Sequence, residues 1–264
     1  EKVIVAGANG FIGRHLVPAL AKQYEVITVT RRPESIDGAR NVIWDGKTVG
    51  DWAKELEGAF AVINLSGKSV NCRHNEKNKA AILNSRVFTT EAVGQAIGQC
   101  KNPPKVWLNS SGVSIYKESF NEPQDETATE FDTDFLADVT KKWEEACLKY
   151  APETRKVLMR TSVILGLEDG SYPLIAKLTK LYGGGKQGSG KQYFPWMHVT
   201  DFCTIVRDTL LQNDQISGPV NMCAPEFVTN SEFMAAMRKG HNRSFGFPAP
   251  AFLLKIGSVI IGTE

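Results

Sequence analysis

The stretch that decides the fold is "VIVAGANGFIGRHL", residues 3–16. An apolar run typical of a strand is followed by Gly7, Gly10 and Gly13 and then by a helical segment. In such a strand–turn–helix unit the first glycine allows the tight turn and the second lets a pyrophosphate approach the helix N-terminus. The third allows close packing of helix and sheet. The context therefore predicts a dinucleotide site, with a tight turn that binds no ligand as the alternative.

The end of the expected second strand, "EVITVT" at residues 25–30, indicates which dinucleotide binds. An NAD site places an aspartate or glutamate there, about 20 residues after the glycines, to bind the ribose 2′-hydroxyl. Thr30 is followed instead by Arg31 and Arg32. Guanidinium groups are planar, permanently charged and suited to a 2′-phosphate. We therefore predict NADP(H) as the cofactor, with a solvated basic turn as the alternative.

Apolar runs alternate with helix-length segments along the rest of the chain, which is typical of parallel βαβ units. Because the runs are continuously apolar, we expect a sheet covered on both faces. The predicted fold class is α/β: a doubly wound parallel sheet of the NAD(P)-binding Rossmann type, in strand order 3-2-1-4-5-6, with a small C-terminal substrate lobe. We expect residues 1–165 to form the NADP-binding domain and residues 166–264 the substrate lobe, with some Rossmann elements interleaved. The strands are expected at residues 2–7, 25–30, 41–45, 59–67, 105–112, 155–166 and 218–225.

Composition and charge argue against several classes of function. The chain has 264 residues, 42% of them hydrophobic and 23% charged, as expected of a globular protein with a full core. A net charge of +2 gives no indication of a nucleic-acid or membrane-surface partner. The four histidines are scattered, so we expect no metal site. No run reaches the ~18 apolar residues of a membrane span, and "AFLLKIGSVIIG" at residues 251–262 is expected to form a buried or amphipathic helix.

Cysteine usage and the chain ends bear on localisation. The five cysteines are odd in number and form no CxxC pair, which indicates reduced thiols in an intracellular, reducing compartment. The pI of about 8.3 is compatible with a protein of the mitochondrial matrix or of a plastid, and we favour the mitochondrial matrix over the cytoplasm or a plastid. The sequence begins with Glu1 rather than methionine, so we expect that a presequence has been removed or that the N-terminus is incomplete.

Several motifs point to one family. "GANGFIG" has the spacing of the extended short-chain dehydrogenase/reductases, the nucleotide-sugar epimerase group, which the chain resembles. The stretches "NLSGKSV", "LNSRVFTT", "KKWEEAC" and "MRTSVILG" resemble the atypical epimerase family 39U within that group, and so does the long motif "GGGKQGSGKQYFPWMHVTD" at residues 183–201. The resemblance runs from Lys2 to about Pro250. Because the family pattern continues further, we expect that the chain is truncated at its C-terminus.

The resemblance implies an NADP-binding protein and assigns its cofactor contacts. Thr30 and Arg31 would bind the 2′-phosphate, and Leu65 and Ser66 would lie beside the ribose and the pyrophosphate. An acidic family residue before the "SR" pair falls here on Ala81, so that contact is not expected. The charge argument above adds Arg32. The full set of predicted cofactor-binding residues is Gly7, Gly10, Phe11, Ile12, Gly13, Thr30, Arg31, Arg32, Leu65, Ser66, Arg86 and Ile164.

The catalytic pair of the superfamily is incomplete. Its reductases use Tyr-x-x-x-Lys on one helix face, the tyrosine as general acid and base, the lysine to lower the tyrosine pKa and to hold the ribose. In the corresponding helix, "DFLADVTKKWEEAC" at residues 134–147, Ala137 stands four residues before Lys141. Lys141 would still reach the ribose. A literal match from Tyr182 to Lys186 encloses three glycines and makes a poor helix.

Three other residues are candidates for the missing acid. Ser111, with Ser110 beside it, ends the expected fifth strand, where a serine usually assists the tyrosine. Tyr116 follows in the same segment and could replace the acid if its loop folds inward; packing under the lobe is the alternative. Histidine titrates near neutral pH, which suits His198 to proton transfer, with packing at a strand end as the alternative. Asp201 is expected to cap the helix that follows.

Two functional hypotheses follow. The first is an NADP(H)-binding, epimerase-like protein with weak or no classical epimerase or reductase activity, serving as a cofactor-binding subunit of a larger assembly or as a redox sensor. The second is an active NADP(H)-dependent oxidoreductase or epimerase that acts on a small polar or sugar-nucleotide substrate with a substitute acid. The glycine loop and the arginines support both, since fold does not settle function. The missing tyrosine favours the first, and the cleft-side sequence "GSGKQYFPWMH" at residues 188–198 favours the second.

Overall fold

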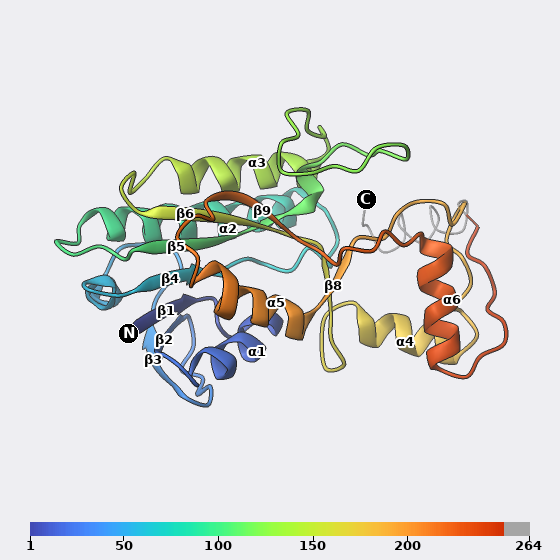
Figure 1. The fold of residues 1–264 in the computed structure, drawn as a ribbon, viewed down its shortest axis with the longest axis horizontal. Helices are drawn as coiled ribbons and strands as arrows, with labels where there is room; N and C mark the ends of the chain where they lie inside the picture. Colours follow the sequence, from blue (N-terminus) through green and yellow to red (C-terminus); the bar gives the residue numbers. More distant parts are fainter. Residues whose placement is uncertain (251–264) are drawn as a thin grey trace.

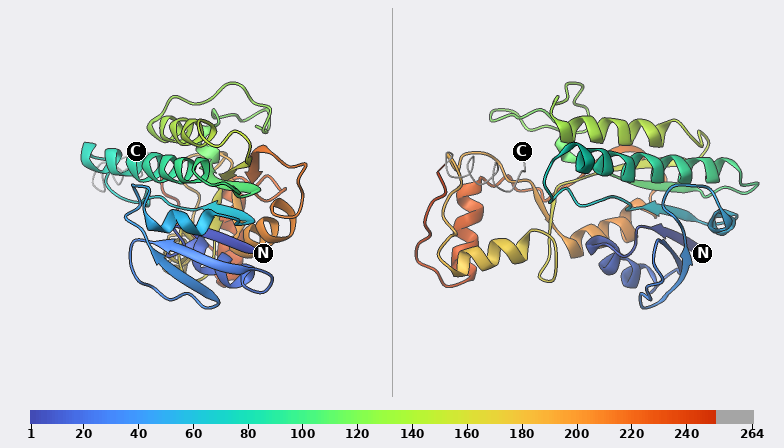
Figure 2. Two further views of the ribbon diagram at one scale, coloured as in Figure 1. Left: turned by 90° about the vertical axis from the view of Figure 1, so that its left-hand side faces the viewer. Right: turned by 180° about the vertical axis from the view of Figure 1, so that it is seen from behind.

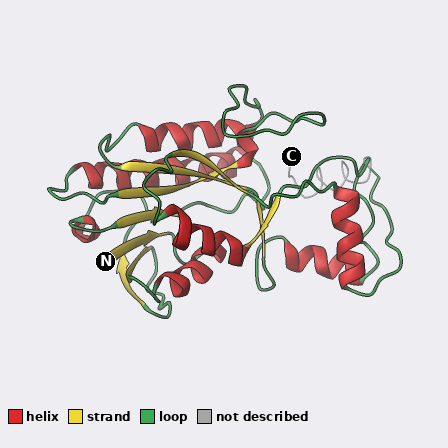
Figure 3. Cartoon of the chain, in the orientation of Figure 1, coloured by secondary structure: helices red, strands yellow, loops and turns green. Residues whose placement is uncertain are grey.

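The computed structural model describes residues 1–250, and the helix expected at residues 251–262 lies outside this range. Seven parallel strands form one sheet in the order β3-β2-β1-β4-β5-β6-β9 (Figure 1 and Figure 3). This confirms the predicted α/β fold and its strand order 3-2-1-4-5-6, and it adds β9 beyond β6. The strands are β1 (Lys2–Ala6), β2 (Glu25–Thr30), β3 (Ala39–Ile43), β4 (Ala61–Asn64), β5 (Val106–Gly112), β6 (Arg155–Thr161) and β9 (Gly218–Met222).

Helices cover both faces of the sheet (Figure 2). The alternation of side chains along β1 shows why: Val3 and Val5 pack in the apolar cluster on one face, and Ile4 and Ala6 pack in the cluster on the other. The first cluster contains residues of α1 (Phe11–Leu20), α5 (Val199–Ile205) and the π-helical turn η3 (Val206–Leu210). The second contains residues of α2 (Glu76–Gly98), α3 (Phe135–Leu148) and the 3-10 helix η1 (Asp51–Leu56).

The predicted sixth strand at residues 155–166 is divided in the structure. β6 ends at Thr161, and β7 (Val163–Leu165) leaves the main sheet to pair in parallel with β8 (Trp196–His198). The break falls at Ser162, whose backbone N–H and hydroxyl both donate to the carbonyl oxygen of Met222, at 3.1 and 2.8 Å. These two bonds hold the chain to the end of β9 at the point where it turns away from the sheet.

Beyond β7 the chain builds a small lobe, drawn at the right of Figure 1. Two helices, α4 (Tyr172–Lys180) and α6 (Asn230–Gly240), share an apolar cluster that includes Phe233, Met234 and Met237. A capping box between Thr229 and Glu232 begins α6. The chain returns to the sheet through α5 and β9 between these two helices, so the lobe and the sheet are interleaved in sequence.

Candidate functional site

A cavity of about 660 Å³ opens at the carboxyl edge of the sheet. The chain passes from β1 to β2 and β3 on one side and resumes at β4 on the other, so the strand order reverses between β1 and β4. Ligands of open α/β sheets bind at this position. The cavity is lined by the glycine turn, by residues 29 and 30 of β2 and residues 31, 32 and 34 after it, by residues 44–46 after β3, by residues 65–69 after β4, and by residues 81, 85 and 89 of α2.

The glycine turn is shaped for a close approach. Gly7 has φ = +74°, in the left-handed region, and a Cβ there would lie 2.7 Å from the backbone nitrogen of Ser66. At Gly10, the N-cap of α1, a Cβ would meet only the Gly7 carbonyl oxygen, at 3.6 Å, so the space before the helix is open. The first-turn amides of α1 have no intrahelical partner and can bind an anion. Asn9 Oδ1 is buried with no partner in the described part of the chain, which leaves an acceptor for a ligand.

Four other predicted contacts lie around α1 and β7. A Cβ at Gly13 would lie 2.2 Å from the carbonyl oxygen of Ala8, so glycine is required where the helix meets the turn. Phe11 and Ile12 pack against the apolar cluster of this face, to which Ile164 of β7 belongs. None of these three apolar side chains lines the cavity. Their cofactor contacts stay predictions.

The end of β2 presents two cations to the cavity. Arg31 and Arg32 are exposed and line it. The Arg31 stem lies against Gly46, where an added Cβ would be 3.3 Å from its Cδ. The Thr30 hydroxyl donates to the Arg32 carbonyl oxygen at 2.7 Å, which fixes the turn that carries both guanidinium groups. A nucleotide phosphate at this edge would meet positive charge.

Two carboxylates share the cavity with these arginines, Glu34 and Asp45. The Asp45 carboxylate accepts from the Thr48 hydroxyl at 2.6 Å and from the amides of Thr48 and Lys47 at 2.8 Å. These bonds, the hydroxyl first, lower the pKa of Asp45. Its carboxylate therefore serves the turn after β3, and its position differs from the end of β2 where an NAD-binding acid would stand.

A buried polar network sets the loop after β4. Ser66 donates its backbone N–H to Asn64 Oδ1 at 3.1 Å, and Asn64 Nδ2 donates to Thr90 Oγ1 and Asn109 Oδ1 at 3.1 and 2.9 Å. Asn64, Thr90 and Asn109 are fully buried. The network ties β4, α2 and β5 together and presents Leu65 and Ser66 to the cavity, where both were predicted to bind cofactor.

Arg86 of α2 lies behind this loop. Its Nη1 donates to the carbonyl oxygens of Lys68 and Ile82, both at 3.0 Å, and its guanidinium stacks over the Trp143 ring at 5.0 Å. Burial lowers the pKa of Arg86 to about 10. Within residues 1–250 no carboxylate forms an ion pair with it. The protein thus holds a desolvated cation beside the cavity without a counter-charge of its own.

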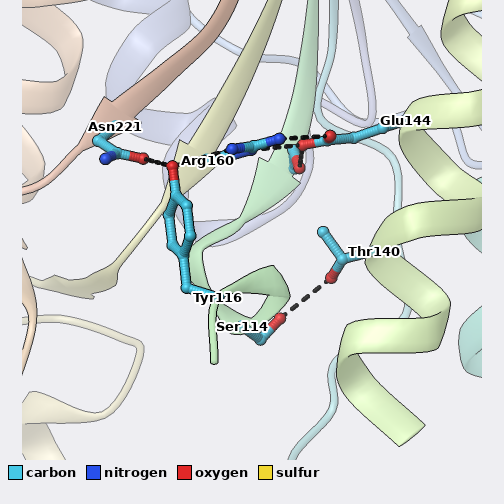
Figure 4. Close-up of polar contacts among 7 residues, drawn as sticks. Ser114, Tyr116, Thr140, Glu144, Arg160 and Asn221 are labelled. Carbon is cyan, nitrogen blue, oxygen red and sulfur yellow. Dashed lines mark hydrogen bonds and ion pairs between the residues drawn. The ribbon is translucent and has the colours of Figure 1, made fainter. Parts of the chain in front are cut away.

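The serine and tyrosine candidates belong to one hydrogen-bonded cluster, of which Figure 4 labels Tyr116, Glu144, Arg160 and Asn221. Ser111 Oγ donates to Glu144 Oε1 at 2.5 Å, and Glu144 receives Nε and Nη2 of Arg160, both at 2.9 Å. Arg160 Nη1 donates to the Tyr116 hydroxyl at 2.9 Å, and that hydroxyl donates to Asn221 Oδ1 at 2.7 Å. Burial raises the pKa of Tyr116, although the hydrogen bond from Arg160 opposes it. Its environment therefore makes Tyr116 a weaker acid.

The face of α3 that meets the end of β5 carries Ala137, Thr140 and Glu144, all buried. Thr140 Oγ1 lies 3.0 Å from Ser114 Oγ (Figure 4). Lys141, one turn after Ala137, is partly buried, and its amine donates to the backbone carbonyl oxygen of Asp132 in the loop before α3. In the described conformation Lys141 supports that loop; its contact with a ribose stays a prediction.

His198 ends β8 and caps the next helix. Its Nδ1 accepts from the backbone N–H of Thr200 at 3.2 Å, so His198 rather than Asp201 is the N-cap of α5. A ring nitrogen that accepts this bond carries no proton, which leaves the proton on Nε2. His198 is exposed and lines neither of the two cavities described in this section. Its catalytic role stays a prediction.

A second cavity, of about 320 Å³, lies beyond the end of β5. Its walls are residues 113 and 116–124 after β5, residues 192–195 before β8, and residues drawn from 221–228 after β9. Tyr116 and Asn221 connect this cavity to the buried cluster of Ser111, Glu144 and Arg160. The structure thus separates a basic cavity over β1 and β4 from a second one over β5 and β9.

A model of the NAD dependent epimerase/dehydratase family matches residues 3–223. The human epimerase family protein SDR39U1 is 33% identical over 258 residues, which cover 96% of this chain and 85% of that protein. The chain belongs to this epimerase family, of the SDR39U1 type. A homologue from Arabidopsis thaliana described as chloroplastic is 31% identical and covers 96% of this chain and 74% of its own length.

A crystal structure of human SDR39U1, isoform 2, with NADPH has the same fold as this family member. It superposes with a TM-score of 0.88 at 32% identity, covering 99% of this chain and 86% of that one. NADPH in that relative agrees with the NADP cofactor predicted from Arg31 and Arg32. The resemblance to the 39U family that the motifs indicated is confirmed.

Sequence reasoning missed several residues that line the cofactor cavity, among them Lys68, Asn9 and Ser85. Ser85 Oγ accepts from the backbone N–H of Lys68 at 2.9 Å, which joins the loop after β4 to α2. The pairing of "SGK" with "NSR" gave no local signal, because 17 residues separate the two partners. Ala81 does line the cavity, at the place where the family pattern has an acid.

Three further properties of this family member hold for residues 1–250. No helix there is long and apolar enough to cross a membrane. Histidine, cysteine and acidic side chains form no group of three that could hold a metal ion. The five cysteines are free, two of them buried in the apolar clusters.

Proposed function

We propose that this protein binds NADP(H) in the 660 Å³ cavity, in preference to NAD(H). The observation that carries the proposal is the end of β2, where Arg31 and Arg32 line the cavity at the position that an NAD-binding carboxylate would occupy. The pyrophosphate meets the amides at the start of α1, and the 2′-phosphate meets Arg31 with help from Arg32. Leu65 and Ser66 flank the ribose, and Phe11, Ile12 and Ile164 lie toward the nicotinamide.

Arg86 supports the same proposal from the other side of the cavity. Its guanidinium has no carboxylate partner within residues 1–250, and it lies against Gly67 in the loop that follows β4. An added Cβ at Gly67 would be 3.3 Å from Arg86 Cζ, so the loop and the guanidinium are in contact. A phosphate oxygen at this loop would supply the missing negative charge.

We further propose that classical epimerase or reductase turnover is weak or absent, so that the protein serves as a cofactor-binding subunit of a larger assembly. The nicotinamide would supply a hydride acceptor or donor, but the α3 face beside it offers Ala137 and Thr140 instead of a tyrosine. A positioned acid or base contributes about 10²–10⁴ in rate, and alanine supplies none of it. Ser111 and Tyr116, the nearby hydroxyl groups predicted to replace it, already donate to Glu144 and Asn221.

The test measures binding and turnover on the same preparation. Calorimetry with NADPH and NADH should give a dissociation constant about ten- to a hundredfold lower for NADPH, the ratio expected of one charge-assisted phosphate contact. Incubation with NADP⁺ and a panel of UDP-, GDP- and dTDP-sugars should give no epimer at ordinary enzyme rates. Equal affinities would refute the cofactor proposal, and turnover of about 1 s⁻¹ or faster would refute the non-catalytic one.

A second candidate function is an active NADP(H)-dependent oxidoreductase or epimerase for a small polar or sugar-nucleotide substrate. The second cavity favours it, because a cavity beside the end of β5 gives a substrate a place close to the nicotinamide end of the cofactor site. Turnover that is lost in Tyr116→Phe would identify the substitute acid. Turnover that survives in Tyr116→Phe and is lost in His198→Asn would assign the role to His198.

The remaining expectations concern domains, partners and compartment. We propose residues 166–264 as the substrate lobe; the separate apolar cluster of α4 and α6 supports this within the described range. Free cysteines support a reducing compartment, with the mitochondrial matrix favoured over the cytoplasm or a plastid. Detection of the native protein in separated organelle fractions, and its elution alone or with other proteins on size exclusion, tests both points.

A further inference from the structure

One wall of the second cavity is held in place by hydrogen bonds from residues behind it. Tyr116 and Asn221 line the cavity and are joined by a hydrogen bond of 2.7 Å. Behind them Arg160 donates to the Tyr116 hydroxyl and forms a bidentate pair with Glu144 (Figure 4). Glu126 accepts from the backbone N–H of Asn221 at 2.6 Å. Because these groups are fixed by one another, a ligand would meet a preorganised surface.

The rim of this cavity is acidic. Glu118, Glu122 and Glu226 line it, and within residues 1–250 none of these three carboxylates has a described hydrogen bond or ion pair. Lys117, the one basic residue among the described lining residues, forms an ion pair with Glu130 at 3.4 Å. The loop of residues 117–134, whose first part lines the cavity, carries seven carboxylates: Glu118, Glu122, Asp125, Glu126, Glu130, Asp132 and Asp134.

Aromatic rings share the rim with these carboxylates. Phe120, Tyr193 and Phe227 line the cavity and are 52%, 48% and 70% exposed, so their faces are available to a ligand. Tyr193 and Phe227 stand edge to face at 6.3 Å. An aromatic face attracts a cation through its quadrupole, and a nearby carboxylate adds Coulombic attraction.

We infer that the second cavity binds an organic cation: an amine or quaternary ammonium group attached to an apolar or aromatic body. A volume of about 320 Å³ suits a small molecule of this class. The inference goes beyond cofactor binding and requires no turnover. If the protein is an active enzyme, it names the substrate class, and on that point it rests on the second candidate function.

The same geometry argues against a sugar nucleotide in this cavity. A diphosphate is recognised by guanidinium or ammonium groups that are free to donate. Arg160 is behind the wall, with Nε and Nη2 on Glu144 and Nη1 on Tyr116. Within residues 1–250 no arginine lines the cavity and its one lysine, Lys117, is paired with Glu130, so the phosphates would face three carboxylates.

The test uses three probes of nearly the same shape and different charge: benzylammonium, benzyl alcohol and benzoate. Protein-detected NMR titration at neutral pH measures the affinity of each, with NADPH present and absent. We expect benzylammonium to bind at least about tenfold more tightly than benzoate, with benzyl alcohol between them, and no competition with NADPH. UDP-glucose should not displace benzylammonium.

Variants divide the two components of the site. Glu226→Gln and Glu122→Gln should each lower the affinity for benzylammonium by about three- to tenfold and leave the affinity for benzyl alcohol unchanged, because only the charge is removed. Phe227→Ala should weaken both probes, because the ring contacts both. Glu153→Gln removes the same charge from an exposed residue before β6, at the opposite edge of the sheet, and should change neither.

Specific outcomes would overturn the inference. Equal affinity for the three probes, tighter binding of benzoate, or full benzylammonium affinity in Glu226→Gln/Glu122→Gln would show that the rim does not select a cation. Displacement of benzylammonium by UDP-glucose would show that the cavity takes a nucleotide. Failure of these probes leaves the NADPH measurement intact, so the inference and the cofactor proposal can fail separately.

Discussion

Two arginines in this fold have similar aromatic neighbours but differ in whether a carboxylate pairs with them. Arg86 stacks over Trp143 and Arg160 over Tyr116, both at 5.0 Å, and consecutive residues of α3 hold them: Trp143 the first and Glu144 the second. Arg160 has a bidentate partner in Glu144 at 2.9 Å. Arg86 donates only to backbone carbonyl oxygens among its described contacts. The charge of Arg160 is therefore neutralised by the protein, whereas we propose that the charge of Arg86 is neutralised by a bound ligand.

The pKa values show the same contrast. Burial alone would lower the pKa of Arg160, but its hydrogen bonds to Glu144 and Tyr116 raise the pKa overall. Burial is the only cause acting on Arg86, and it lowers the pKa to about 10. Below that pH Arg86 is charged in both the folded and the unfolded chain. At neutral pH the full free-energy cost of desolvating the Arg86 guanidinium therefore counts against folding. A bound phosphate would offset this cost, which couples folding stability to cofactor binding at Arg86.

The largest expected effect is a loss of folding stability when Arg160 loses its partner Glu144. Glu144→Ala leaves Arg160 buried without a counter-charge and removes the acceptor of Ser111, so we expect a loss of about 3–5 kcal/mol in the free energy of unfolding. Urea denaturation of the apo protein measures it, and Glu144→Gln gives a milder loss if the alanine variant does not fold. Glu145→Ala, the exposed neighbour on α3, is the control and should change stability by less than about 0.5 kcal/mol. A loss below about 1 kcal/mol in Glu144→Ala would show that the pair is not structural.

The second prediction concerns the unpaired arginine. Arg86→Met keeps the length of the stem and removes the charge, so we expect NADPH affinity to fall about ten- to a hundredfold. Apo stability should be unchanged or higher, because an unpaired desolvated charge has been removed. Calorimetry and urea denaturation of the same variant measure the two quantities, with Arg86→Lys as the variant that retains charge. A loss of apo stability comparable to that of Glu144→Ala, with NADPH affinity intact, would contradict the comparison.

The sequence predicted the parts of this site that depend on local patterns. The glycine turn, the end of β2 and the strand order follow from residues that are neighbours in the chain, and the structure confirms the fold that they indicate. The side-chain contacts of α3 were not predictable in this way. Counting four residues back from Lys141 identifies Ala137, but it does not show that the Lys141 amine donates to the carbonyl oxygen of Asp132, or that Glu144 and Thr140 pair with Ser111 and Ser114.

Other features missed in the sequence depend on partners that are distant along the chain. The break between β6 and β7 at Ser162 requires the carbonyl oxygen of Met222, 60 residues later. Arg86 entered the site through family resemblance alone, and its lack of a carboxylate partner within residues 1–250 is visible only when α2, the loop after β4 and α3 are packed together. A charge pattern in the sequence shows which cations exist, and only the packed structure shows which of them are neutralised.

The third prediction tests the exposed arginine of the cofactor cavity. Arg31→Ala should lower the preference for NADPH over NADH by about tenfold, because we propose that its guanidinium contacts the one phosphate that distinguishes the two cofactors. NADH affinity itself should change little. Calorimetric titration with both cofactors measures the ratio, and Arg73→Ala, which removes an exposed arginine that does not line the cavity, is the control. An unchanged ratio in Arg31→Ala would assign the 2′-phosphate elsewhere.

The smallest expected effect is on the salt dependence of NADPH binding, which should distinguish the exposed Arg31 from the desolvated Arg86. Between about 0.01 and 1 M salt the Debye length falls from roughly 30 to 3 Å, which screens exposed charges far more than desolvated ones. Arg31 is exposed and Arg86 is held against Trp143, so salt should weaken NADPH binding mainly through Arg31. We expect the salt-induced rise in the NADPH dissociation constant to be about two- to threefold smaller in Arg31→Ala than in the wild type. In Arg86→Met it should match the wild type. Titrations of the three proteins at both salt concentrations measure this. If Arg86→Met loses as much salt dependence as Arg31→Ala, then solvent reaches Arg86 in the free protein. Arg86 and Arg160 would then differ only in that Arg160 has a carboxylate partner.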